Sequence, residues 1–479
     1  MKKIGKLSLV PLVFLILGAV IGSGFSDLPA NMAKRAGAYG ILLAWIITGV
    51  GILALVLVYR NLSLRKPNLN SGIASYARAG FGDYIGFNSA WGYWLSAVCA
   101  NASYFVIIFN ALAYFFPGLF ERDHLTIGAL IGGTAIIWFI QYLVCKGVRK
   151  AAMLNVVVQI AKFLPILLFL VILVAVFNID KFSLDFFSAD TGLANIGTQV
   201  KSIMLVTVWV FIGIEGAIVL SERANFRKDI GRATIIAMFC ALLIYILISL
   251  LTFGYMSQQE AAALNTPSTA YILEQIVGSW GAAIVNCGLI ISVLGAMLGW
   301  TILASEVIYV GAKDRLMPKI FAKENRCNAP VNGLLLTNGL SQMLLIIAFL
   351  SAAAYEAIFF IATTAILLPY LLSGMYGMKL AITGETYDKN PKGRKKDIFT
   401  ATLCTIYAIW LVYAAGIENL LVVSILYAPG ILLYAKVQQE NGKKVFSNHS
   451  DVVVFTAITL MAVIATFMLV SGRIVIGDS

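Results

Sequence analysis

Long apolar runs separated by short polar segments dominate the chain. A helix needs about 20 consecutive apolar residues to cross the hydrocarbon core of a bilayer. Candidate runs of this kind cover residues 8–35, 38–59, 84–116, 125–145, 152–178, 200–221, 233–256, 279–311, 332–353, 355–378, 398–416, 419–435 and 452–471. The pattern predicts an all-α integral membrane protein with about thirteen spans, or twelve if 398–416 and 419–435 are not separate. The intervals 119–125, 178–199 and 256–278 are predicted to be polar connections.

Composition and charge agree with this class. Hydrophobic residues make up 60% of the 479 positions and charged residues 12%, whereas about a quarter of a soluble domain is charged. The net charge of +12 does not indicate nucleic-acid binding, because the basic residues fall in short loops between apolar runs. Most of them fall in alternate loops, which predicts a cytoplasmic N-terminus and, with an odd number of spans, an outside C-terminus.

The polar segments contain little that suggests chemistry. The longest inside loop, 381–397, is polar and basic and is interpreted as a solvated connection. The six cysteines have no C-x-x-C spacing, and His124 and His449 lie in loops. We therefore expect no catalytic site, no metal site and no cofactor.

Two of the predicted spans carry glycine interruptions at matching depths. The first contains Gly22-Ser23-Gly24 with Pro29 close behind, and the sixth contains Gly213-Ile214-Glu215-Gly216. Each glycine weakens a helix by about 1 kcal/mol relative to alanine. Because the two spans enter the membrane from opposite sides, the pair indicates an inverted repeat of spans 1–5 and 6–10 and marks a transporter's binding site. Close helix packing is the alternative reading of such glycines.

Unwound backbone in a membrane survives where it lines a cavity. The freed N–H groups of such a break suit a carboxylate, and the freed carbonyl groups suit an ammonium. These are the two charged groups that every α-amino acid shares. The matched breaks therefore predict a site for an amino acid.

Glu215 and Lys162 are the two ionisable residues predicted to lie deep in the bilayer, where a charge costs at least about 2.5 kcal/mol. Glu215 is expected to sense a cationic substrate or to take up a proton. The alternative is that its carboxyl group bonds the frayed backbone of the first span and fixes the fold. Lys162 lies about ten residues into the fifth span, roughly 15 Å deep.

Several stretches carry a resemblance to a known family. They are Ile21-Gly22-Ser23-Gly24, Leu28-Pro29-Ala30-Asn31-Met32-Ala33, Trp91-Gly92-Tyr93-Trp94, Ala100-Asn101, Trp209-Val210-Phe211-Ile212-Gly213-Ile214-Glu215 and Leu298-Gly299-Trp300-Thr301. Through them the chain resembles the amino acid–polyamine–organocation (APC) superfamily, and within it the basic amino acid/polyamine antiporters. The Phe81–Phe87 entry to the third span is most similar to arginine/ornithine exchangers. Histidine/histamine and lysine/cadaverine exchangers are close alternatives.

The resemblance implies how the amino acid's head group is held. The backbone N–H groups of Ser23 and Gly24, with the Ser23 hydroxyl, would bind the carboxylate. Carbonyl groups near Val20, Trp209 and Ile212 would bind the α-ammonium. Trp209 would also cap the substrate as an outer gate.

The resemblance also implies a pocket for the cationic side chain. Asn101 would meet it by a hydrogen bond and Trp300 by a cation–π contact, and Thr364 matches a hydroxyl position of that site. Asp27 replaces a usually apolar residue, either adding negative charge at the outer mouth or lying solvated there.

In relatives, a lysine at the Lys162 position contacts the unwound backbone of span one and replaces a sodium ion. We expect its ammonium to pair with carbonyls near Ile21 and Gly22 and with the Ser305 hydroxyl. A permanent charge would make the carrier sodium-independent, a titrating one would couple protons, and a purely structural pairing is the alternative.

The implied fold is a LeuT-like 5+5 inverted-repeat transporter core over residues 8–382, with discontinuous helices 1 and 6. Residues 8–178 and 200–382 would form the repeats, and 398–471 the C-terminal accessory membrane helices. The expected protein is no enzyme but a multi-pass antiporter of a bacterial-type inner membrane, monomer or homodimer. It would contact lipid and exchange cationic amino acids and amines, arginine for ornithine first among them. A proton-coupled importer of a cationic amino acid is the main alternative. A channel would need a repeated pore segment, which the sequence lacks.

Overall fold

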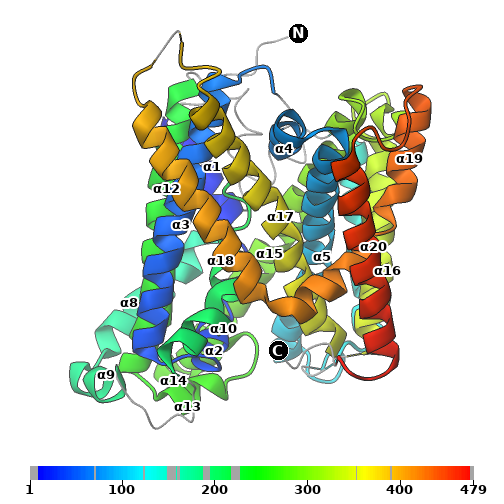
Figure 1. Cartoon of the computed structure of the whole chain (residues 1–479). Helices are drawn as coiled ribbons and strands as arrows, with labels where there is room; N and C mark the ends of the chain where they lie inside the picture. The colour runs from blue at the N-terminus through cyan, green and yellow to red at the C-terminus, as the bar shows by residue number, and fades with distance from the viewer. Residues whose placement is uncertain are drawn as a thin grey trace. The chain divides into compact units, whose positions relative to one another are not determined.

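The computed structural model describes residues 9–69, 72–121, 124–147, 158, 162–186, 195–216, 227–351, 353–388 and 391–474 (Figure 1). Every regular element in these residues is a helix. In the first half of the chain the helices are α1 (Leu9–Val20), α2 (Leu28–Ala33), α3 (Ala38–Arg65), α4 (Ile73–Phe81), α5 (Asp83–Phe115), α6 (Ile127–Cys145), α8 (Phe163–Val176), α9 (Ile179–Phe186) and α10 (Ile196–Trp209). The second half contains α12 (Arg227–Leu251), the 3-10 helix η2 (Thr252–Gly254), α13 (Gln258–Ala262), α14 (Ser268–Val277), α15 (Ser279–Lys313), the 3-10 helix η3 (Lys319–Ala322), α16 (Val331–Leu350), α17 (Ala353–Thr383), α18 (Arg394–Tyr427), α19 (Gly430–Glu440) and α20 (His449–Val470).

Nine helices within the described residues are long and apolar enough to cross a membrane. They are α3, α5, α6, α12, α15, α16, α17, α18 and α20. The all-helical membrane class is thereby confirmed for this part of the chain, whereas the count of thirteen spans stays a prediction. The first predicted span is divided between α1 and α2, and the spans predicted over 152–178 and 200–221 lie partly outside the described residues.

The least certain pair of predicted spans meets at a kink. A continuous helical assignment runs from Arg394 to Tyr427, but Gly416 inside it has φ 76° and ψ 156°. Only glycine adopts such a backbone without strain, so two helices join there. The predicted gap between 416 and 419 therefore coincides with a real change of direction.

Two of the predicted polar connections are not plain loops. Residues 178–199 include α9, and residues 256–278 include α13 and α14. In α13 the Ser257 side chain accepts the Glu260 N–H while the Glu260 side chain accepts the Ser257 N–H. This capping box lets a short polar segment begin a helix, so these polar connections contain short helices that the sequence pattern did not indicate.

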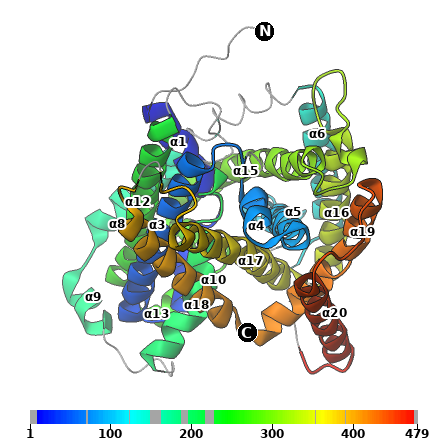
Figure 2. The same cartoon turned by 45° about the horizontal axis from the view of Figure 1, so that its top comes forward.

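The chain divides into two compact units. The first comprises residues 1–56, 104–131 and 152–297, and the second comprises 57–103, 132–151 and 298–479. Within the first unit, α1 packs along α12, and the short α2 contacts α10, α12, α13 and α14. Within the second, α17 packs along α18 and α4, and α18 packs against α20 (Figures 1 and 2). The unit boundaries fall inside α3, α5 and α15, among others, so they do not follow the predicted repeats, which stay a proposal.

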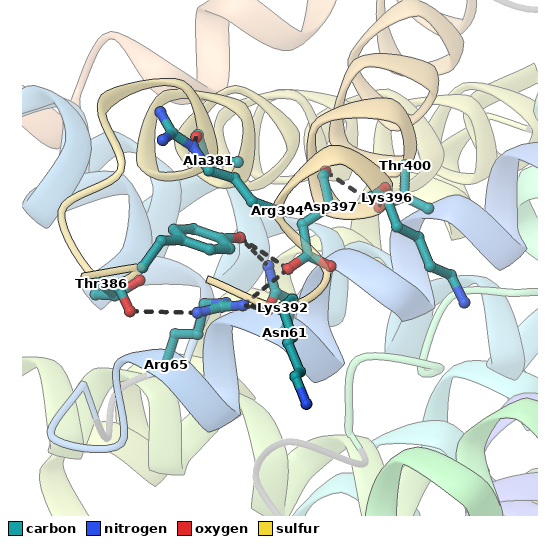
Figure 3. Close-up of polar contacts among 10 residues, drawn as sticks. Asn61, Arg65, Ala381, Thr386, Lys392, Arg394, Lys396, Asp397 and Thr400 are labelled. Atoms are coloured by element: carbon teal, nitrogen blue, oxygen red, sulfur yellow. Dashed lines mark hydrogen bonds and ion pairs between the residues drawn. The ribbon is translucent and has the colours of Figure 1, made fainter. Parts of the chain in front are cut away.

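The loop before α18 is fastened by a polar network in the second unit (Figure 3). The Arg65 guanidinium pairs with the Asp397 carboxylate at 3.1 Å and donates to Asn61 Oδ1 at 2.8 Å. It also lies 3.5 Å from the centre of the Tyr387 ring, whose hydroxyl donates to Asp397 at 2.8 Å. The interpretation of 381–397 as a merely solvated connection is therefore wrong, because this network holds the loop to the end of α3.

Candidate functional site

The first predicted break is present in the structure. Helix α1 ends at Val20, α2 begins at Leu28, and residues 21–27 between them are not helical. A Cβ atom added at Gly24 would lie 2.6 Å from Val210 Cγ1 and 3.2 Å from Trp209 Cδ1. Gly24 is therefore needed because the backbone of this break passes directly against the end of α10.

The second predicted break follows α10. The helix ends at Trp209, and residues 210–215 form turns in which Gly213 has φ 110°. The Glu215 carboxylate, 2% exposed, accepts the Gly213 N–H at 3.0 and 3.1 Å. These two hydrogen bonds hold the backbone of the break in which Glu215 itself lies. The alternative prediction had the Glu215 carboxyl group bond the backbone of the first span instead. The continuation over 217–226 lies outside the described residues.

Carbonyl oxygens at the end of α1 and in the first break are contacted by side chains that are distant in the sequence. Lys162, which is fully buried, donates from Nζ to the carbonyl oxygens of Gly18 and Ile21. The Gly22 carbonyl lies 3.5 Å from the Ser292 hydroxyl. The predicted Lys162 contact with Ile21 is observed, but Gly18 takes the place predicted for Gly22.

The predicted partner Ser305 belongs to the second unit. Its hydroxyl donates to the carbonyl of Ile302 in its own helix at 2.8 Å. A serine hydroxyl has one hydrogen to donate and two lone pairs that can accept, so this local bond does not decide whether Ser305 accepts from the Lys162 ammonium. The contact of Ser305 with Lys162 stays a prediction.

The N–H groups of the same break are open. Within the described part of the chain, the backbone N–H groups of Ser23, Gly24 and Phe25 donate no hydrogen bond. The Ser23 hydroxyl is buried and also has no partner there. Buried polar groups in proteins are nearly always paired. An open set of donors next to an orphaned hydroxyl therefore fits an anionic ligand such as a carboxylate.

The predicted acceptors for the α-ammonium differ in how open they are. The Val20 carbonyl lies 2.9 Å from the Gly22 N–H and 3.2 Å from the Tyr245 hydroxyl, and the Trp209 carbonyl accepts the Ile212 N–H at 3.2 Å. The Ile212 carbonyl accepts no hydrogen bond from any described residue. A carbonyl oxygen has two lone pairs, so the structure favours Ile212, then Trp209, over Val20.

Trp209 itself lies in the wall of the site. Its side chain is 8% exposed, and its ring packs edge-on against Tyr104 with 6.3 Å between centroids. It also contacts the position where Gly24 lacks a side chain. This location, at the end of the helix before the break, is compatible with the predicted capping role.

The predicted side-chain pocket residues lie in the second unit. Asn101 donates from Nδ2 to Thr301 Oγ1 at 3.1 Å, while its buried Oδ1 has no partner among the described residues. Trp300 directly precedes Thr301, and the centroid of its ring lies 6.4 Å from the centroid of the Tyr93 ring. The Thr364 hydroxyl is buried and likewise lacks a described partner. The structure thus brings Asn101 beside the Trp300 segment, and it records no contact that joins Thr364 to them.

Asp27 is buried and not solvated. It is 8% exposed, and its Oδ1 accepts the Ser268 N–H at 3.1 Å. The Ser268 hydroxyl in turn donates to the Ser26 carbonyl at 3.0 Å. The expectation that Asp27 lies solvated is therefore wrong, because it joins the first break to the α14 segment. Its contribution of negative charge at the outer mouth stays a prediction.

Sequence reasoning missed three side chains that contact the predicted site residues or the first break. Tyr245 reaches the Val20 carbonyl, Ser292 reaches the Gly22 carbonyl, and Thr301 accepts from Asn101. Each is a polar residue inside a long apolar run. Polar groups at such depth usually find a protein partner, and this signal was available for all of them. It does not, however, tell which partner they take.

Several known proteins are similar to this chain along nearly its whole length. A family model described as amino acid permease matches residues 7–462. A protein named arginine/ornithine antiporter from Pseudomonas aeruginosa is 41% identical over 474 residues, which make up 98% of each chain. Proteins named arginine/agmatine antiporter from Chlamydia felis and Chlamydia trachomatis serovar D are each 38% identical over 98% of this chain and 97% of theirs. The matches extend over nearly the whole chain and are not confined to the broken helices.

Proposed function

Because this chain belongs to the amino acid permease family, we propose that it is a membrane antiporter that exchanges a cationic amino acid for its breakdown product. Arginine is the proposed substrate and ornithine the proposed counter-substrate. The names of the similar proteins support this pair, since each includes arginine. They are also names of transporters, not of enzymes.

The observation that carries the proposal is the unlike polarity of the two breaks. The first break offers open donors at Ser23, Gly24 and Phe25, and the second offers an open acceptor at Ile212. The carboxylate of an amino acid would accept from the donors, and its α-ammonium would donate to Ile212 and Trp209. Charge-assisted hydrogen bonds of this kind are about twice as strong as neutral ones.

For the cationic side chain we propose Asn101, Trp300 and Thr364. The unpartnered Asn101 Oδ1 is an acceptor that a guanidinium can use. The Trp300 ring supplies a face for a cation–π contact. Glu215 is proposed to respond to the positive charge of the substrate, and Lys162 to stand where a sodium ion would otherwise bind the broken backbone.

The wider arrangement is proposed from the sequence. It comprises a LeuT-like core of two inverted five-helix repeats, a cytoplasmic N-terminus and residence in a bacterial inner membrane. Scanning accessibility of single cysteines placed in successive loops tests the topology. Labelling from the outside at both 256–278 and 381–397 would contradict it.

Counterflow in proteoliposomes tests the exchange. Vesicles loaded with ornithine should accumulate labelled arginine rapidly, and empty vesicles should accumulate little. Because only occupied sites of an exchanger cross the membrane quickly, equal uptake by empty vesicles would refute antiport. Such uptake, if driven by an inward proton gradient, would favour a coupled importer.

A further inference from the structure

Tyr245 lies where the two breaks come together. It belongs to α12 and is fully buried. Its hydroxyl oxygen is 2.9 Å from the Val210 carbonyl oxygen and 3.2 Å from the Val20 carbonyl oxygen. Val20 is the last residue of α1, and Val210 is the first residue after α10. One hydroxyl therefore reaches the carbonyl at which each helix stops.

The Tyr245 ring is held from several sides. It stacks on Trp45 with 5.8 Å between centroids and 15° between planes, and it packs edge-on against Phe211 at 5.5 Å. The Trp45 indole donates to Ser249, whose hydroxyl donates to the Tyr245 carbonyl. Phe211 itself belongs to the second break. The position of the hydroxyl is thus fixed by the packing of the ring and not by hydrogen bonding alone.

A tyrosine hydroxyl has one hydrogen, so it donates to one of the two carbonyls at a time. The shorter distance favours Val210, while the Val20 oxygen already accepts the Gly22 N–H at 2.9 Å. In either case the hydroxyl occupies the approach to both oxygens. The next open acceptor along the second break is Ile212.

We propose that Tyr245 is a positioning residue for the amino group of the substrate, an inference that rests on the proposed function. Its hydroxyl ties the end of α1 to the end of α10 and keeps the Val20 and Val210 carbonyls from the ligand. The α-ammonium is thereby directed to the Ile212 carbonyl, while the carboxylate of the same molecule accepts from the Ser23 and Gly24 N–H groups.

Tyr245→Phe tests this, because it removes the hydroxyl and retains the ring that packs on Trp45 and Phe211. Equilibrium binding of arginine and of agmatine, which is arginine without its carboxylate, is measured on the full chain in lipid nanodiscs. The freed Val20 and Val210 carbonyls should draw the ammonium away from Ile212. Arginine, held at both ends, should lose about tenfold in affinity, the effect of one lost buried hydrogen bond. Agmatine has no carboxylate that must stay at the Ser23 and Gly24 N–H groups while its amine shifts, so its affinity should fall less than about threefold.

Thr252→Val is the matched control. The Thr252 hydroxyl is also fully buried and donates to a backbone carbonyl, that of Ile248, at 2.9 Å. Its loss should lower thermal stability as a buried hydroxyl does and leave the ratio of arginine to agmatine affinity unchanged. A ratio in Tyr245→Phe equal to that of the control would overturn the inference, whatever the change in stability.

If Tyr245→Phe does not fold, 3-fluorotyrosine incorporated at position 245 replaces it. The fluorine makes the hydroxyl a stronger donor and keeps the ring, so the preference for arginine over agmatine should rise. An unchanged preference would overturn the inference. The proposed function is judged separately, by arginine–ornithine exchange of the unmodified chain. If that chain exchanges the two amino acids but the ratio of arginine to agmatine affinity does not change at position 245, the role of Tyr245 is refuted and the proposed function stands.

Discussion

Replacing Gly24 by alanine is the sharpest test of the contact between the two breaks. The added Cβ would lie 2.6 Å from Val210 Cγ1, a separation that real Cβ atoms essentially never have, and 3.2 Å from Trp209 Cδ1. Val210 can change rotamer only slightly, because its side chain is 3% exposed. The two broken segments must therefore move apart.

The size of the effect follows from this geometry. Forcing an extra carbon into a packed interior costs about 1–3 kcal/mol. If that strain is relieved by separating Ser23 from the α10 break, the same energy is lost from binding a ligand that must touch both. Since 1.4 kcal/mol is tenfold in affinity, arginine should bind about 5- to 150-fold more weakly.

Isothermal titration or scintillation proximity binding of arginine to the purified variant measures this loss. Gly339→Ala is the control, because Gly339 lies in the membrane helix α16 and a Cβ there meets nothing within 4 Å. Its affinity should equal that of the unmodified chain. A folded Gly24→Ala protein that binds arginine with unmodified affinity would refute the close apposition of the breaks at the ligand.

Three further substitutions address other parts of the molecule. Lys162→Met keeps the buried hydrocarbon but leaves two carbonyls without a donor, each costing about 1–3 kcal/mol, so exchange at saturating arginine should slow; normal turnover would leave the lysine a structural role only. Trp300→Ala should weaken arginine binding about fivefold more than binding of a neutral amino acid, the scale of a cation–π contact, and equal losses would exclude the ring from the side-chain pocket. Arg65→Lys keeps the charge but loses the planar contact over Tyr387, so the melting temperature should fall while the KM for arginine holds; an altered KM would connect this network to the site.

The sequence predicted the two breaks well because their cause is local. Two glycines flank a polar residue inside an apolar run in each case, and helix propensity there is low whatever the surroundings. The need of Lys162 for acceptors was equally readable, since a charge inside a long apolar run must be paired. Its contact with the broken backbone of the first span could therefore be predicted.

Only one of the two carbonyls that Lys162 meets was predicted. Ile21 was expected, but the second acceptor is Gly18 in the last turn of α1 and not Gly22. Once a helix unwinds, the regular spacing of 3.6 residues per turn no longer gives the direction of each carbonyl, so the direction of the Gly22 carbonyl could not be read from the sequence. Asp27 illustrates a second limit. Its partner Ser268 is 241 residues away in the sequence, and no local pattern around either residue indicates the other. The burial of Asp27 depends on that tertiary contact.

Tyr245 illustrates a third limit, since a tyrosine in an apolar helix has the same pattern whether its hydroxyl faces a loop, a lipid headgroup or a broken helix. Hydrophobic periodicity reports which face of a helix is buried and not what the end of a side chain touches. Short polar helices such as α13 escape the same analysis, because their capping residues resemble those of a turn.

The open donors of the first break give a physical reason for exchange. Lys162 donates to the carbonyls of Gly18 and Ile21, whereas the N–H groups of Ser23, Gly24 and Phe25 donate to no described residue. In the proposed function a ligand carboxylate accepts from these N–H groups. In a closed, dry state each unpaired buried group costs about 1–3 kcal/mol.

Three such groups raise the energy of an empty closed carrier by several kcal/mol, and a carboxylate removes that cost. We therefore expect the loaded carrier to turn its binding site from one side of the membrane to the other about a hundredfold or more faster than the empty carrier. Release of labelled arginine from vesicles into medium with and without ornithine measures the ratio, and equal rates would show that these donors do not govern the crossing.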